Sequence, residues 1–211
     1  MRRPLGRDLW RQSFPFTCGP AALGGVLSAL GWNPSGDRGE EELAIWREST
    51  AVACPGAHPL GLALAARLRG FDPEVVWLGP RPWLWPHVRR DHHFSRKSEY
   101  VRIEGFFARE ARAAHIPVRR GLGSTPTASP GLLLVTVHGA RDERHDPHWV
   151  GVLPEGDRRW ISDPLRSRAW SERTPLAGRW TSSGFEGTRV WIGLRPRKSA
   201  AASVPARLGT R

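Results

Sequence analysis

The stretch Gln12-Ser-Phe-Pro-Phe-Thr-Cys18-Gly19-Pro20-Ala-Ala22 places a thiol six residues after a side-chain amide and directly before the start of a helix. Proline is favoured in the first turn of a helix, and Ala21 to Leu30 combines helix formers with apolar spacing. A thiol attacks only as its thiolate, and a helix N-terminus and a nearby imidazolium both favour that form. The alternative is that Cys18 is a small buried apolar residue. We expect it to be a nucleophile because further catalytic groups follow downstream.

A nucleophilic thiol needs a general base, and the base needs a group that orients it. His148 begins the run His-Trp-Val-Gly-Val, which is typical of a strand, and Asp163 follows a second such run fifteen residues later. If the two strands pair as a hairpin, the imidazole and the carboxylate meet. The rivals for the base are His58, His138 and His145, and none of them has both a following apolar strand and a later Asp-Pro. Asp142, Asp146 and Asp157 remain competitors of Asp163 for the carboxylate.

Attack on an amide carbon creates an oxyanion, which is stabilised by hydrogen-bond donors. A backbone N–H at the cysteine turn and the side-chain NH₂ of Gln12 can supply two such donors. Gly19 leaves room for the backbone of a substrate. Trp149, next to the expected base, is the second residue that we expect to contact a substrate. This chemistry requires no cofactor and no metal ion, and Cys54 with His58 is only two of the three or four ligands that zinc needs.

The chain has 211 residues and a net charge of +12. A basic balance favours nucleic-acid binding. However, Lys97 and Lys198 are the only lysines, and the arginines are scattered rather than gathered in a stripe. We therefore expect a peptide or protein substrate, and nucleic-acid binding remains only a third hypothesis. The sequence has no apolar run long enough for a membrane segment and no secretory signal. Two cysteines make no disulfide framework, so we expect a reduced, cytoplasmic setting.

The pattern along the chain predicts an α+β fold, in which helices come first and an antiparallel sheet follows. The expected helices are Ala21–Leu30, Glu40–Glu48, a third from Pro59 to a glycine cap at Gly70, and Tyr100–His115. Leu132–Val137 is a continuous apolar run and should be a buried central strand. The other expected strands are Pro73–Leu78, Ile116–Arg119, Trp149–Leu153, Arg159–Ser162 and Arg189–Leu194. We expect residues 1–11 to be a lead-in, 12–195 the domain, 79–97 an irregular loop and 196–211 a disordered tail.

The combination Gln-x5-Cys-Gly-Pro-Ala, His-Trp-Val-Gly-Val and Asp-Pro resembles the papain-like bacterial cysteine peptidases of family thirty-nine. Those enzymes remove double-glycine leader peptides from bacteriocin precursors. The stretches Ile45-Trp-Arg-Glu-Ser-Thr and Pro59-Leu-Gly-Leu-Ala-Leu-Ala-Ala-Arg-Leu-Arg-Gly-Phe resemble a stand-alone bacterial branch of that group. The similarity spans roughly Gln12 to Leu194. It implies a papain-like fold, with Cys18 as nucleophile, His148 as base, Asp163 as the orienting group and Gln12 as oxyanion donor.

Two features depart from the family pattern. Thr17 stands where the family usually has an acidic or similar residue directly before the cysteine. The peptidases of the family are usually the N-terminal part of an ABC transporter, whereas we expect no transporter segment here. The sequence thus leaves three functions open on this fold: a peptide or isopeptide hydrolase that processes a leader, a transpeptidase in which an amine accepts the acyl group, and a catalytically silent module that binds a peptide or a partner.

Overall fold

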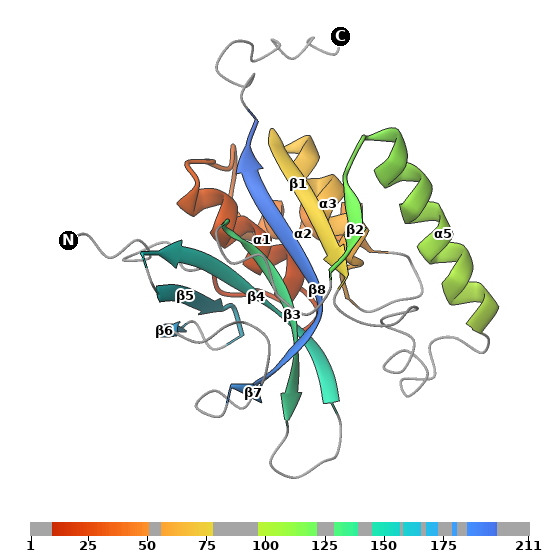
Figure 1. Ribbon diagram of the computed structural model, residues 1–211. Helices are drawn as coiled ribbons and strands as arrows, with labels where there is room; N and C mark the ends of the chain where they lie inside the picture. The colour runs from red at the N-terminus through yellow and green to blue at the C-terminus, as the bar shows by residue number, and fades with distance from the viewer. Residues whose placement is uncertain are drawn as a thin grey trace, which may run out of the picture.

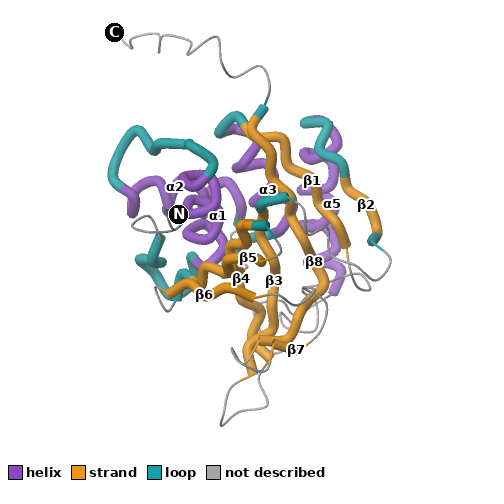
Figure 2. The backbone as a smooth tube through the Cα atoms, turned by 60° about the vertical axis from the view of Figure 1, so that its left-hand side comes forward, coloured by secondary structure: helices purple, strands orange, loops and turns teal. Residues whose placement is uncertain are grey.

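The computed structural model describes residues 10–50, 56–77, 97–121, 129–138, 145–156, 158–165, 168–172, 179–180 and 185–197. The helices within these ranges are α1 (Cys18–Ala29), α2 (Arg38–Ser49), α3 (Pro59–Leu68) and α5 (Lys97–Ala113). Helices α1, α2 and α3 group on one face of the sheet, and α5 packs against α3 near the β2 edge (Figures 1 and 2). The four helices expected from the sequence are therefore present, with ends that differ by at most three residues.

The strands form one sheet in the order β2-β1-β8-β3-β4-β5-β6, and β7 pairs with β8. Their bounds are β1 (Phe71–Trp77), β2 (Val118–Arg120), β3 (Gly131–His138), β4 (His145–Glu155), β5 (Arg158–Asp163), β6 (Arg168–Glu172), β7 (Arg179–Trp180) and β8 (Phe185–Pro196). The predicted α+β class is confirmed. Because β1 and β2 are joined through α5 and run parallel, the sheet is mixed and not purely antiparallel as expected.

Strand β3 lies in the middle of the sheet, between β8 and β4. Leu132 and Leu134 belong to the main core, which also contains residues of α1, α2 and α3, whereas Leu133 and Val135 belong to a second cluster with Trp191. Successive residues of a strand point to opposite faces, so β3 is buried on both sides. The prediction of a buried central strand from this continuous apolar run is therefore confirmed.

Gly61 lies inside α3, where glycine is a poor helix former. A Cβ atom built at this position would lie 2.6 Å from the backbone of Ser49, at the end of α2. Real Cβ atoms do not approach backbone atoms that closely, so the missing side chain allows α2 and α3 to touch. Close helix packing therefore explains a residue that, from the sequence alone, only weakens the helix prediction.

Helices α1 and α5 both end in a Schellman motif, but they have different residues at its left-handed position. In α1 the N–H of Trp32 bonds to Leu27 O and that of Gly31 to Ser28 O, and Gly31 has φ 94°. In α5 the N–H of Ile116 bonds to Ala111 O, and His115 takes the left-handed position with φ 54°. Glycine is the usual residue there because a Cβ atom disfavours this conformation. The predicted helix end at Gly31 is confirmed, whereas α5 ends on a strained histidine.

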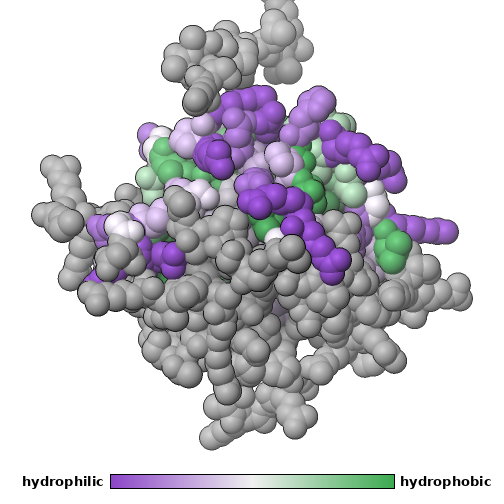
Figure 3. All heavy atoms as spheres, in the orientation of Figure 1, coloured by the Kyte–Doolittle hydropathy of each residue, from purple (hydrophilic) through white to green (hydrophobic). Residues whose placement is uncertain are grey.

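The ends of the domain remain predictions. Trp10, inside the expected lead-in, is buried against Gly24 of α1 and Trp32. Residues 78–96, which cover most of the expected loop, and 198–211 of the expected tail lie outside the described residues. Among the described helices, none combines the length and apolar character that crossing a bilayer requires. On the face seen in Figure 3, the described surface is mostly hydrophilic, with smaller hydrophobic areas between the charged side chains.

Candidate active site

Cys18 is the first residue of α1 and is half-buried. The first backbone bond of the helix runs from Ala21 N–H to Thr17 O, and Thr17 places no side-chain cap on the helix. The leading N–H groups of a helix have no partner within it and carry the positive end of its dipole. The thiol therefore lies where backbone donors and a favourable field for negative charge coincide.

The imidazole of His148 and the carboxylate of Asp163 meet as the sequence predicts. Strands β4 and β5 pair antiparallel, with Gly151 opposite Ser162. This register brings His148 Nε2 to 2.8 Å from Asp163 Oδ1, and both side chains are buried. The backbone N–H of Leu165 donates to the same oxygen at 3.0 Å, which fixes the carboxylate at the turn after β5. The ring of His148 is thus held in one orientation.

Cys18 is the second residue whose side chain acts on the ring of His148, which brings the thiol, the imidazole and the carboxylate together in one site. Because Nε2 faces Asp163, Nδ1 is the nitrogen on the side of the sulfur. Burial alone would lower the pKa of His148, but the hydrogen bonds and charges of Asp163 and Cys18 outweigh burial and raise this pKa to about 9. The imidazolium is therefore the favoured form near neutral pH, which is the partner that a thiolate needs.

Gln12 lies in the loop that leads to Cys18 and is hydrogen-bonded to the turn that follows Asp163. Its backbone N–H donates to Pro164 O at 3.1 Å, directly after Asp163. Its Nε2 donates to Phe14 O at 3.0 Å. A side-chain amide has two N–H groups, and this bond uses one of them. That Gln12 binds an oxyanion remains a prediction. The backbone bond to Pro164 holds this loop at the end of β5.

Gly19 and Trp149 are in contact with each other. A Cβ atom at Gly19 would lie 2.9 Å from Cδ1 of Trp149 and 3.0 Å from the side chain of Ala57. Trp149 itself is buried, at 3% exposure. Packing of α1 against β4 therefore accounts for the absence of a side chain at Gly19. A contact between either residue and a substrate remains a prediction.

Glu42 of α2 is not among the predicted site residues, yet it reaches the loop before the thiol. Its carboxylate is 1% exposed and accepts hydrogen bonds from Ser13 and from the Thr17 hydroxyl. One signal was present in the sequence: Glu42, Ile45 and Ser49 have the spacing of one helix face, and that face is buried. An acidic residue on an apolar helix face indicates a specific partner inside the fold.

His58, a rival for the base, has a structural place. It is buried at the N-cap of α3, where its Nδ1 accepts the N–H of Leu60 at 3.2 Å, and its ring stacks on Phe107 with centroids 4.4 Å apart. Burial lowers its pKa to about 3, so the ring stays neutral. His58 therefore supports the start of a helix. Cys54, the other member of the weak metal-ligand pair, lies outside the described residues.

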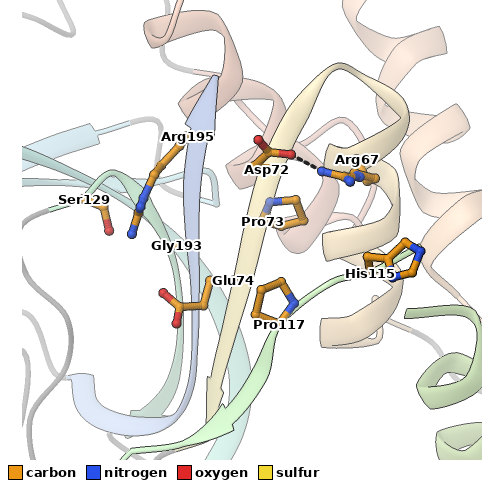
Figure 4. Close-up of a pocket in the computed structure, with 9 residues that line it drawn as sticks. All are labelled: Arg67, Asp72, Pro73, Glu74, His115, Pro117, Ser129, Gly193 and Arg195. Carbon is orange, nitrogen blue, oxygen red and sulfur yellow. Dashed lines mark hydrogen bonds and ion pairs between the residues drawn. The ribbon is translucent and has the colours of Figure 1, made fainter. Parts of the chain in front are cut away.

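A separate pocket of about 390 Å³ lies beside β1 and β8, and its lining includes none of the residues of the candidate site. Figure 4 shows both signs of charge around it. Asp72 is in an ion pair with Arg67, and Glu74 is in an ion pair with Arg119. Its carboxylates are thus already paired. Within the part of the chain described above, no group of three or more His, Cys, Asp or Glu residues could hold a metal ion.

A family model described as the Peptidase C39-like family matches residues 8–174, which is well over half of the chain. The chain belongs to this family. Membership confirms the resemblance drawn from Gln12, Cys18, His148 and Asp163, all of which fall within the matched span, and it indicates a peptidase-related function. The mixed sheet with helices on one face is consistent with the papain-like fold of the family. No curated protein matches the chain.

Proposed function

We propose that the protein is a cysteine peptidase-like hydrolase that cleaves a peptide or isopeptide bond through an acyl-enzyme on Cys18. The observation that carries the proposal is the position of His148, whose ring is hydrogen-bonded to Asp163 at 2.8 Å and interacts with Cys18 at the N-terminus of α1. A thiol without function has no need of an oriented imidazole beside it. The family membership supports the same reaction class.

In the proposed reaction the Cys18 thiolate forms a bond to the carbonyl carbon. Gln12 Nε2–H and a backbone N–H at the start of α1 stabilise the oxyanion. As the C–N bond breaks, Nδ1–H of His148 gives its proton to the leaving amine, which yields a thioester. His148 then takes a proton from a water whose oxygen attacks the thioester, and the C–S bond breaks. Asp163 keeps the ring oriented throughout.

The proposed biological task is processing of a peptide, with leader removal as the form suggested by the family. A transpeptidase differs only in the acceptor, because an amine replaces water in the second half-reaction. Product analysis with and without added amine separates the two. A product that is hydrolysed in both cases excludes the transferase.

The test compares wild type with Cys18→Ala on a peptide library, and Cys54→Ala is the control because it removes the other thiol of the chain. We expect Cys18→Ala to abolish cleavage and Cys54→Ala to retain it. Iodoacetamide should also alkylate Cys18 at mildly acidic pH faster than a free thiol. Cleavage that survives in Cys18→Ala would refute the proposal, and a Cys18 no more reactive than a free thiol would support the silent binding module.

A further inference from the structure

We propose that Glu42 is a positioning residue. Its buried carboxylate fixes the segment from Ser13 to Thr17, and this segment sets the position of the Gln12 amide relative to the Cys18 thiol. The inference rests on the function proposed above, because an oxyanion donor needs placing only if Cys18 attacks a carbonyl group.

The carboxylate of Glu42 binds both ends of this segment. At one end the N–H of Ser13 donates to Oε1 at 2.8 Å and to Oε2 at 3.1 Å, and its hydroxyl donates to Oε2 at 2.8 Å. At the other end the Thr17 hydroxyl bonds to Oε1. The two ends are therefore held to one rigid group on α2, more than twenty residues away in the sequence.

Helix stability does not explain an acidic residue at this position. Burying a carboxylate is costly unless its oxygens are hydrogen-bonded or paired with a cation. No cation in the described ranges forms an ion pair with Glu42, and the donors described for it come from Ser13 and Thr17. An apolar residue would fill the same helix face, next to Ile45, without this cost. The carboxylate thus serves the loop rather than α2.

The segment that Glu42 holds is connected directly to both groups of the site. The carbonyl oxygen of Phe14, inside the segment, accepts Nε2–H of Gln12 at 3.0 Å and the N–H of Thr17 at 3.2 Å. Thr17 is the N-cap of α1 and precedes Cys18. A shift of the segment therefore moves the oxyanion donor relative to the thiol. Glu42 acts through Gln12 and touches neither the sulfur nor the position of the substrate.

The proposal predicts that Glu42 and Gln12 are coupled. The experiment measures kcat and KM on a pool of internally quenched peptides for wild type, Gln12→Ala, Glu42→Gln and the double variant. Glutamine keeps the shape of Glu42 but places an NH₂ group where one oxygen accepted hydrogen bonds. We expect Glu42→Gln to lower kcat roughly 10- to 100-fold with little change in KM, since displacement by about 1 Å costs on this order. In the Gln12→Ala background it should have no further effect. Glu40→Gln, on the same helix and exposed, should leave kcat unchanged.

Alkylation of Cys18 by iodoacetamide is the second readout, because it does not use the oxyanion donor. We expect its rate to be unchanged in Glu42→Gln. If kcat falls by the same factor in both backgrounds, or if alkylation slows as much as kcat, the inference is overturned and Glu42 has only a general structural role. If Glu42→Gln does not fold, Ser13→Ala is the second variant, because it removes one hydrogen-bond donor from an exposed residue. Its smaller loss of kcat must show the same dependence on Gln12. Turnover that persists in Cys18→Ala refutes the proposed function and this inference with it. If Cys18→Ala is inactive but Glu42 and Gln12 show no coupling, the inference alone is refuted.

Discussion

Replacing Asp163 by asparagine tests what holds the ring of His148 in its charged form. Asparagine has nearly the same shape and keeps an oxygen near Nε2, but it carries no charge. Asp163 is 1% exposed, so little water screens its interaction with the ring. Burial then acts against the imidazolium without the opposing charge of Asp163, while the interaction with Cys18 remains. We expect the pKa of His148 to fall from about 9 towards or below its ordinary value of 6.5.

The size of the effect follows from the pKa. A rise from 6.5 to about 9 corresponds to about 3 kcal/mol of preference for the charged ring in the folded protein. Because the pKa is higher in the folded state than in the unfolded state, this stabilisation is complete below pH 6.5 and is lost as pH rises through about 9. Asp163→Asn removes the share that Asp163 contributes, so the variant should lose less stability than wild type across this range.

Two measurements test the reasoning. An NMR titration of the histidine rings gives the pKa of His148, with His148→Gln to assign its signal. Urea unfolding at pH 6.5 and pH 9 gives the matching free energies of unfolding. Asp72→Asn is the control, because Asp72 is half-exposed and pairs with Arg67 on the surface. If His148 titrates in Asp163→Asn as it does in wild type, the carboxylate does not hold the ring charged and the reasoning is wrong.

Two further predictions concern stability and are checked by urea or thermal unfolding. Gly61→Ala should destabilise the protein by about 1–3 kcal/mol, because its Cβ would overlap the backbone of Ser49. Gly105→Ala, in α5 with nothing within 4 Å of the new Cβ, should instead stabilise by about 0.5–1 kcal/mol, and equal signs would contradict the packing argument. His115→Gly should stabilise by about 1 kcal/mol by relieving the left-handed φ of 54°, whereas His115→Ala should bring no such gain.

The sequence predicts much of the candidate site because its groups lie at the ends of short regular elements. Pro20 marks the helix start beside Cys18. The two strand-like runs around His148 and Asp163 form a local hairpin, whose pairing depends on a few residues of turn. Local patterns of this kind are readable without knowledge of the rest of the fold. The match to the Peptidase C39-like family covers residues 8–174, a span that contains these residues.

Glu42 could not be placed by the same reasoning, because its partners are more than twenty residues away. The prediction of an acidic helix over Glu40–Glu48 is correct in extent but does not show which side of the helix is buried. The parallel pairing of β1 with β2 is also non-local. A strand–helix–strand order is the usual connection between parallel strands, and this signal was present in the predicted elements.

The position of β8 has a consequence for how the protein is made. The most C-terminal strand lies between β1 and β3 and supplies the described hydrogen bonds that connect β1 and β2 to the other strands. A ribosome therefore delivers Cys18 long before β8, the strand that completes the sheet. A nascent chain, or one cut before residue 185, holds the thiol, the imidazole and the carboxylate but not the strand that unites the sheet. We therefore expect the candidate site to reach its final geometry only after β8 has been synthesised and has joined the sheet.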